Sequence, residues 1–421
     1  MKYGIKTIDD FQFANKVVLC RVDMNSPLKK DKSGFSDITR IKRSIPTLKE
    51  LANYQAKLVV MTHQGSDVEY HNYHHTRMHA EELSRLVGQA VKYIDDVCGP
   101  AAREAIQQLA PGEILLLDNV RFMAEEMTLF ETKLKLTSAE QANTQVVTKL
   151  APLADYYICD AFAAAHRAQP TLLGFEELLP SAMGRLFEQE YTVLNQIIQT
   201  PERPCIFVLG GAKVQDAFMM IKAVLEKGTA DLVLAGGLVG NIMLLAAGIE
   251  LGKTSIEFLK KRNLWDLIAV AKNILKIYRE RIVLPEDLAY LAASARKEVM
   301  IKDLGPVNQL FFDIGRKTVE RFREEITAAQ TIFFNGPMGI FEEKESSYGT
   351  KKVLEAIAQS PGFSVVGGGD SITAINKYGL TDHFSYICTG GGALIRFLSG
   401  EELPVIKALK KGAQDEGVKR C

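Results

Sequence analysis

The sequence has no excess charge of either sign, since 51 lysines and arginines are balanced by 51 aspartates and glutamates in 421 residues. A chain with this balance gives no overall field that favours nucleic acid or a membrane surface, so we expect neither as a partner. An anionic ligand would have to be bound by a local cluster of groups. The length exceeds what one hydrophobic core usually supports, and we expect two domains.

Cysteines with metal-site or redox-site spacing are also missing, because no CxxC occurs. The six cysteines lie mostly inside apolar runs, which indicates buried, reduced thiols and argues against a disulfide framework; they are Cys20, Cys98, Cys159, Cys205, Cys388 and Cys421. The N-terminus lacks the unbroken apolar stretch of a signal peptide, because Asp9 and Asp10 interrupt it. These features predict a cytoplasmic protein.

One long apolar run without charge, residues 232–249 (LVLAGGLVGNIMLLAAGI), is nearly long enough to span a bilayer. Its Gly236, Gly237 and Asn241 are typical of a turn between a strand and a helix. We therefore expect a strand, a turn and a helix here, and no membrane segment.

Short apolar runs of strand length recur along the chain, most of them rich in valine and isoleucine. They occupy residues 17–24, 57–63, 113–119, 156–162, 205–211, 231–237, 281–287, 331–337, 363–369 and 384–391. Their apolarity is continuous, which is typical of parallel strands covered by helices on both faces. Helical periodicity at 38–52, 79–90, 214–228 and 316–329 predicts the helices that connect these strands. The fold class is α/β.

A long helix is predicted near the middle of the chain, at about 184–200, and PERP at 201–204 ends it. We expect the domain junction there.

The ends of the predicted strands differ between the two halves of the chain, and in parallel sheets ligands bind at the carboxyl ends.

The strands of the first half end on polar and basic residues: Arg21, Asp23, Asn25, His63, Asn119, Arg121, Asp160, His166 and Arg167, with Arg40 at the start of a helix. A single arginine is usually solvated or salt-bridged. Several at strand ends favour a small, multiply anionic substrate, because planar guanidinium groups bind carboxylate and phosphate oxygens bidentately.

The strands of the second half end on glycines, most clearly in VVGGGDSITAI at 365–375. Tight turns would explain any one glycine pair. Repeated before helices, glycines let backbone N–H groups approach anionic oxygens. Neither GxxxxGK[ST] nor GxGxxG is present, so the site is neither a Walker nor a Rossmann fingerprint.

Asp370, directly after these glycines, would repel phosphate unless a cation stood between them, which suggests Mg²⁺. Capping a helix that begins at Ser371 is an alternative, and both roles are compatible.

Histidines at 71, 74, 75 and 79 suggest a metal site, but neither cysteines nor a carboxylate cluster accompany them in the sequence. We expect a surface loop that enters a helix.

Together these motifs resemble the phosphoglycerate kinase family over nearly the whole chain, and archaeal members in particular. The resemblance rests on RVDMNSP, MTHQG, LLLDNVRF, DAFAAAHRAQPT, LGGAKVQD, NGPMGIFE, VVGGGDS and CTGGGALIRFLSGEELP, in family order. It implies two similar-sized, Rossmann-like, doubly wound lobes that close about a connecting helix. Residues 1–184 plus 400–421 would bind 3-phosphoglycerate, and residues 185–399 would bind ATP or ADP with Mg²⁺.

The resemblance also assigns site residues. For the substrate it implies Asp23, Asn25, Arg40, His63, Ser66, Arg121 and Arg167. For the nucleotide it implies Gly211, Lys213, Asn335, Glu342, Gly368, Gly369, Asp370 and Ser371, with Asp370 towards the magnesium and Glu342 towards the ribose. Arg40 and Lys213 are the expected catalytic residues. A carboxylate acceptor is ionised at neutral pH, so no general base is required.

Three positions depart from the family pattern. Ser66 replaces a phosphate-binding arginine, Ala217 replaces a frequent second lysine, and Asp118 replaces a glutamate. Loss of one charged hydrogen bond weakens binding roughly ten- to a hundredfold, enough to change a substrate. A paralogous kinase that phosphorylates another small carboxylate is therefore an alternative, and a nucleotide-binding regulator without catalysis is a second. The oligomeric state is expected to be monomer or homodimer.

Overall fold

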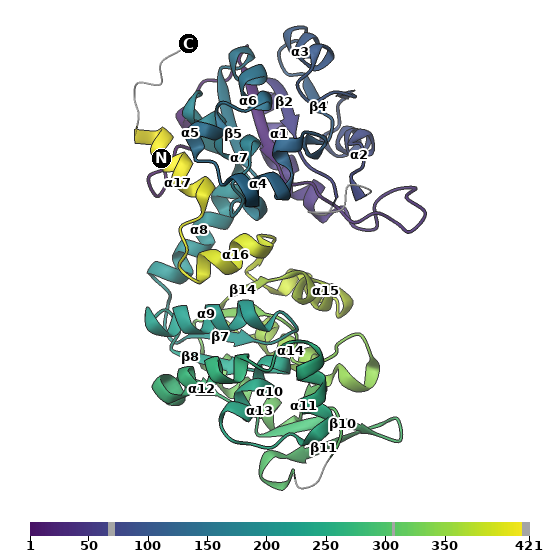
Figure 1. Cartoon of the computed structure of the whole chain (residues 1–421), viewed down its shortest axis with the longest axis vertical. Helices are drawn as coiled ribbons and strands as arrows, with labels where there is room; N and C mark the ends of the chain where they lie inside the picture. The colour runs from purple at the N-terminus through teal and green to yellow at the C-terminus, as the bar shows by residue number, and fades with distance from the viewer. Residues whose placement is uncertain (66–71, 305–307, 415–421) are drawn as a thin grey trace. The chain divides into compact units, whose positions relative to one another are not determined.

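The computed structural model describes residues 1–65, 72–304 and 308–414 (Figure 1). The chain forms two compact units: residues 1–192 together with the segment from Glu402 onward, and Val193–Glu401. Helix α8 (Arg185–Gln199) crosses the division between them.

The first unit is built on a parallel sheet of six strands in the order β3-β4-β2-β1-β5-β6, counted within the described residues. The strands are β1 (Val17–Val22), β2 (Lys57–Met61), β3 (Val91–Ile94), β4 (Ile114–Leu117), β5 (Tyr156–Asp160) and β6 (Ser181–Met183). The helices are α1 (Thr39–Asn53), α2 (Arg77–Val87), α3 (Pro100–Gln107), α4 (Thr128–Leu134), α5 (Ser138–Gln141), α6 (Gln145–Leu150), α7 (Pro170–Leu173) and α17 (Pro404–Gln414).

Alternate residues of each strand enter cores on opposite faces of this sheet. On one face, strand residues such as Val18 and Val60 pack with Leu48 of α1 and Leu83 of α2. Helix α17, yellow in Figure 1, belongs to the same unit although it lies near the end of the chain. It contacts β6 and α7, and the Val405 amide donates to the Ala165 carbonyl.

The second unit has its own parallel sheet of six strands, again counted in the described part of the chain, in the order β15-β14-β13-β7-β8-β9. The strands are β7 (Cys205–Leu209), β8 (Leu232–Ala235), β9 (Ile282–Val283), β13 (Thr331–Asn335), β14 (Phe363–Gly367) and β15 (Tyr386–Cys388). The helices are α9 (Val214–Glu226), α10 (Gly237–Ala246), α11 (Gly252–Lys261), α12 (Leu267–Tyr278), α13 (Arg316–Ala328), α14 (Tyr348–Gln359), α15 (Gly369–Lys377) and α16 (Gly391–Leu398).

The α/β prediction is confirmed, and each of the apolar runs predicted as strands contains one. Sequence analysis missed β3, β6 and a small antiparallel sheet in the order β11-β10-β12. The last consists of β10 (Asp287–Ala292), β11 (Ala295–Met300) and β12 (Asp313–Ile314). Its β11 strand, ARKEVM, is partly exposed and largely polar, so it lacks the continuous apolar signal of a covered strand.

The uncharged run at 232–249 forms β8, a turn and α10, as predicted. A search of the described residues finds no helix that is both long and apolar enough to cross a membrane. The cysteines that the structure describes, all except Cys421, are buried and unpaired, in agreement with their placement in apolar runs.

Candidate active site

In each six-stranded sheet, the order in which the chain adds strands reverses direction at one point. Strand β1 lies between β2 and β5, and β7 lies between β8 and β13. In open parallel sheets, the carboxyl ends of such neighbouring strands leave a crevice that binds ligands. The predicted site residues follow these strands in both units.

In the first unit, Arg21 at the end of β1 is completely buried. Its Nε donates to the Thr171 hydroxyl at 3.0 Å, and its guanidinium also contacts the Val22 carbonyl. Another nitrogen lies 3.2 Å from Nδ1 of His63. Burial lowers the pKa of His63 well below its usual value; the charge of Asp23 opposes this shift, and the surrounding arginines add to it. His63 is therefore neutral at physiological pH.

Asp23 forms an ion pair with Arg40, whose side chain enters from the start of α1, at 2.9 Å. Burial would raise the pKa of Asp23, but the charge of Arg40 and the other neighbouring groups outweigh burial and hold the pKa below its usual range. Asn25 is fixed to the next loop, since its Oδ1 accepts the Gly65 amide at 3.0 Å. A permanent carboxylate thus orients Arg40.

Arg121 and Arg167 complete this group. Arg121 is buried with its guanidinium over the ring of Tyr73, and Arg167 donates to the Thr128 hydroxyl at 3.1 Å. Both lie near enough to His63 for their charges to lower its pKa. We call Arg21, Asp23, Arg40, His63, Arg121 and Arg167 the arginine cluster.

The structure therefore brings together most of the substrate residues expected from the sequence. Ser66, where the family arginine is absent, lies outside the described residues. Asp160 does not join the cluster. It is buried and accepts the amide of Phe187 at 3.0 Å, so it serves the first turn of α8.

In the second unit, glycine-rich turns after four strands surround a small cavity of about 50 Å³. It is lined by Gly210, Gly211, Ala212, Lys213, Asn335, Gly336, Gly368, Gly369, Asp370, Ser371, Gly391 and Ile395. We call these residues the glycine cradle. Hydrogen bonds from backbone amides join the turns, since the Gly211 amide donates to the Pro337 carbonyl at 2.7 Å and the Gly336 amide donates to the Ser371 side-chain hydroxyl at 2.8 Å.

Two of these glycines are required by the geometry. Gly368 has φ +89°, a conformation that other residues rarely adopt. A Cβ on Gly336 would lie 2.3 Å from the Gly210 carbonyl oxygen. Beside them, Nδ2 of Asn335 is buried and has no hydrogen-bond partner among the described residues. An unpaired buried donor is costly, so this N–H is suited to an anionic oxygen.

Helix α15 begins at Gly369, with Gly368 as its N-cap. The alternative that Asp370 caps a helix starting at Ser371 is therefore wrong, because Asp370 already lies in the first turn. Its side chain is exposed and lines the cradle. An exposed carboxylate beside amide donors fits a cation that also contacts phosphate, since Mg²⁺ prefers oxygen ligands.

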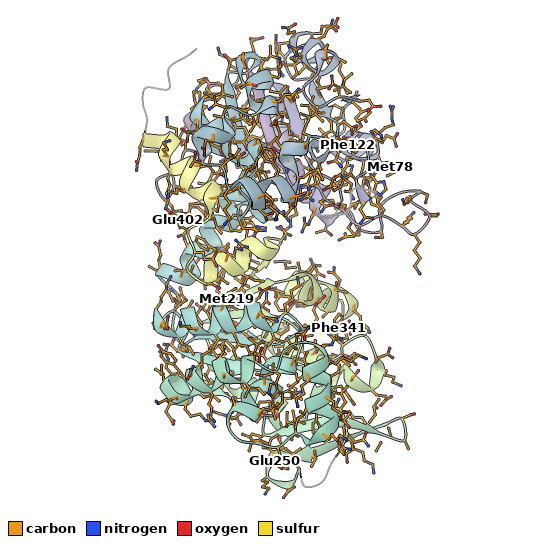
Figure 2. All side chains as sticks on the ribbon, viewed as in Figure 1. Met78, Phe122, Met219, Glu250, Phe341 and Glu402 are labelled. Carbon is orange, nitrogen blue, oxygen red and sulfur yellow. The ribbon has the colours of Figure 1, made fainter. Side chains whose placement is uncertain are left out.

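A larger cavity of about 380 Å³ shares Gly211, Ala212 and Asp370 with the cradle. Its walls are mainly apolar, with Phe258, Leu288, Phe311, Ile340 and Phe341, and Glu342 also lines it. Figure 2 labels Phe341 in the second unit. Asp313, Asp370 and Arg262 are its other charged lining residues. A mainly apolar cavity with a few polar groups, next to a phosphate-sized cradle, is suited to a nucleoside.

Lys377 makes a contact beside the larger cavity that sequence analysis did not predict. Its ammonium group, on α15, donates to the carbonyls of Phe341 at 3.0 Å and Glu342 at 2.7 Å. It thereby joins the helix that starts in the cradle to the loop that carries Glu342. A lone lysine in an amphipathic helix gives no signal of such a contact.

Two further expectations concern single positions. Ala217, in place of a family lysine, is buried in α9 and offers no charge to the cradle. His79 is also buried, and its Nε2 contacts the Met24 carbonyl and Gln64. It is therefore not on the protein surface, where His75 lies. His75 precedes α2 in a loop, as predicted. However, Asp95 and Asp118 do accompany it, which corrects the expectation of no carboxylates nearby.

The fold and the two clusters define a class: a two-unit α/β phosphotransferase, with a cationic cluster in one unit and an amide-lined phosphate cradle in the other. The family model described as phosphoglycerate kinase matches residues 8–401. The chain belongs to the phosphoglycerate kinase family, whose members are phosphotransferases with a carboxyl group as acceptor.

Individual relatives agree with this assignment. The phosphoglycerate kinase of Methanothermobacter thermautotrophicus is 44% identical over 411 residues, covering 98% of both chains. That of Thermococcus kodakarensis is 46% identical over 408 residues, covering 96% of each. The crystal structure of phosphoglycerate kinase from Pyrococcus horikoshii OT3 matches with a TM-score of 0.87 at 42% identity, covering 97% of this chain and 99% of that one. The resemblance to archaeal members is confirmed.

Proposed function

We propose that the chain transfers the γ-phosphoryl group of ATP reversibly to the carboxylate of 3-phosphoglycerate, giving 1,3-bisphosphoglycerate and ADP, a step of glycolysis and gluconeogenesis. A carboxylate oxygen forms the new bond to the γ-phosphorus while the bond to the β–γ bridging oxygen breaks, and ADP leaves with those electrons. The observation that supports this most is the pairing of an arginine cluster and a glycine cradle, each at the ligand-binding crevice of its own sheet.

The first unit is proposed to bind 3-phosphoglycerate, as expected from the sequence for the domain of residues 1–184 plus 400–421. Arg40, Arg121 and Arg167 neutralise its anionic groups, while Asp23, Asn25 and neutral His63 fix orientation through hydrogen bonds. Ser66 is assigned to the same substrate on the family pattern alone. Since Asp23 is ionised, it holds the Arg40 guanidinium ready for the migrating group.

The second unit is proposed to bind the nucleotide, as expected from the sequence for the domain of residues 185–399. The amides of Gly211, Gly368 and Gly369, with Asn335 and Ser371, contact its phosphates. The cavity beside them takes the nucleoside, with Glu342 at the ribose. Lys213, exposed at the start of α9, neutralises charge on the transferred group.

Magnesium is proposed to bind with the nucleotide, and Asp370 is the residue that would hold it. When bound, Mg²⁺ supplies charge neutralisation at phosphate oxygens. The carboxylate acceptor is ionised without help, so the residues around it need not remove a proton. Their task is orientation and charge stabilisation.

Transfer requires the reacting atoms to come within about 3.5 Å. Because the proposed ligands bind to different units, both ligands together should make the protein more compact by a change about α8. Small-angle scattering with neither, one or both ligands measures this. An unchanged radius of gyration with both ligands bound would contradict closure.

A steady-state assay of the full chain with 3-phosphoglycerate, ATP and Mg²⁺ tests the function. We expect a turnover of about 1 to 100 per second, as in other kinases. ATP binding without turnover, not rescued by Ser66→Arg, would overturn the proposal and favour a kinase for another small carboxylate. ATP binding with no acceptor among small acids would favour a regulator. The comparisons support neither alternative. We propose a cytoplasmic location on the composition, because the described cysteines are buried and unpaired.

A further inference from the structure

Three potential metal ligands from separate segments meet at one edge of the first sheet. Strands β3 and β4 are parallel neighbours, with Ile94 opposite Leu117. The next residue of each strand is an aspartate, so Asp95 and Asp118 follow the same register position. His75 reaches them from the loop before α2. Ligand atoms of His75, Asp95 and Asp118 all lie within 4.8 Å of one another.

The ligand atoms lie close enough for a cation to join them. A cation that binds nitrogen and oxygen at about 2.1 Å keeps neighbouring ligand atoms roughly 3 to 3.5 Å apart. Nδ1 of His75 already lies 3.4 Å from Oδ1 of Asp95, whereas its 2.6 Å contact with Oδ2 of Asp118 is a hydrogen bond that would have to lengthen when the ion binds. Without a cation, one imidazole nitrogen has a single proton to share between two carboxylates. Only small side-chain movements would admit the ion.

Asp118 is already oriented in the way that metal-ligating carboxylates usually are. Its Oδ1 accepts the amides of Thr76 at 2.9 Å and Asn119 at 2.8 Å, which leaves Oδ2 directed to His75. Outer-shell hydrogen bonds of this kind orient a ligating carboxylate and strengthen metal binding.

Access and charge also favour binding. Asp118 is only 3% exposed, but the side chains of His75 and Asp95 are 61% and 63% exposed, so an ion can enter from solvent. Two carboxylates balance a divalent charge. The imidazole selects a transition cation over Mg²⁺, which prefers oxygen ligands alone. The ring of Phe122, labelled in Figure 2, lies 5.0 Å from the His75 ring and covers one side of it.

We propose that His75, Asp95 and Asp118 bind one divalent transition cation, of the Zn²⁺ or Co²⁺ kind, at a site separate from the nucleotide. The bound ion fixes the loop before α2 to the ends of β3 and β4. Asn119 joins that loop to the neighbourhood of the arginine cluster. Its side-chain amide donates to the His74 carbonyl at 3.0 Å and to the carbonyl of Gln64, which follows His63 in the chain, at 2.7 Å. The role is structural and does not depend on the proposed reaction.

Titration of the chelator-treated full chain with Co²⁺, in the absence of nucleotide, tests the site. Visible absorption and calorimetry should report one ion per chain. We expect His75→Ala and Asp95→Asn each to weaken binding by more than tenfold, at least the loss seen when outer-shell partners are removed. Both residues are exposed, so these variants should fold. The matched controls are His383→Ala and Asp382→Asn, exposed neighbours in the second unit, and they should bind like the parent.

Other outcomes would overturn the proposal. These are the absence of Co²⁺ binding, equal binding in the parent and both ligand variants, or loss of binding in the controls. Mg²⁺ that displaces Co²⁺ at equal concentration would contradict the transition-metal preference. An independent readout is thermal unfolding with Zn²⁺, which should raise the midpoint of the parent but not of Asp95→Asn.

Discussion

The arginine cluster and the glycine cradle provide positive potential by different physical means. In the first unit, the potential comes from charged side chains that are largely buried, such as Arg21 and Arg121. In the second, it comes mainly from backbone amides and one exposed lysine, Lys213. Buried charges need partners such as Asp23, whereas amide dipoles carry no net charge to compensate.

This difference has consequences for stability and for tolerance of substitution. A buried guanidinium stabilises the fold only with its partners, so removing one member leaves another uncompensated. The cradle depends instead on backbone geometry, as at Gly368, and its charged side chains, Lys213 and Asp370, are exposed. Substitution of site residues in the first unit should therefore lower both activity and stability, whereas substitution of exposed site residues in the second unit should lower activity alone.

Replacing Lys213 with alanine should have the largest effect on catalysis and little effect on folding. Loss of charge stabilisation at the transferred group should lower kcat by roughly a hundred- to a thousandfold. The unfolding midpoint should stay constant, because Lys213 is exposed. Stopped-flow or coupled assays and thermal scans measure both. Lys222→Ala on the same helix, which removes only a surface ion pair with Glu226, is the control. Unchanged turnover in Lys213→Ala would remove this residue from the mechanism.

Arg167→Ala tests the opposite unit. Losing one charged hydrogen bond to substrate should raise KM for 3-phosphoglycerate roughly ten- to a hundredfold. KM for ATP should not change, and some stability should be lost with the contact to Thr128. Arg85→Ala, an exposed arginine paired with Glu82, should leave both constants unaltered. If Arg167→Ala altered only the nucleotide constant, the assignment of ligands to units would fail.

The buried carboxyl of Asp160 should make stability depend on pH. Burial raises its pKa to about 7 in the folded protein, above the unfolded value. The folded state therefore holds the proton more tightly, and stability falls as pH rises from 5 to 8, by on the order of 2 kcal/mol from this group. Denaturant unfolding at several pH values measures it, and Asp160→Asn should flatten the curve. An equally steep curve in that variant would assign the dependence to other groups, such as Glu126, whose pKa burial also raises to about 7.

Lys377→Met should have the smallest effect and sharpens the view of the second unit. Without the hydrogen bonds to the Phe341 and Glu342 carbonyls, the loop that carries Glu342 is held less firmly. KM for ATP should therefore rise about three- to tenfold, with kcat retained. Lys377→Arg should partly restore KM. Lys352→Met, an exposed lysine on α14 paired with Glu355, is the control. A fall in kcat with constant KM would contradict a positioning role.

Much of the fold could be predicted because parallel strands covered on both faces are continuously apolar, and this signal is local in the sequence. It failed for β3 and β11, which are short or half-exposed and mix polar with apolar residues. Site residues at strand ends, such as Asp23 and Asn335, could be predicted because the carboxyl ends of parallel strands share one edge. Lys377 could not, since its contact depends on how α15 packs against a loop more than thirty residues away.

The sequence by itself determined the α/β class, the strands that end on arginines or on glycines, and the family, because each is written in short runs of neighbouring residues. Only the tertiary structure decided that Asp370 lies inside a helix that starts at Gly369, that His63 is kept neutral by burial, and that His75 meets Asp95 and Asp118. These facts depend on distances between segments far apart in the chain. Burial and electrostatic fields arise only when such segments pack together, so no local pattern encodes them.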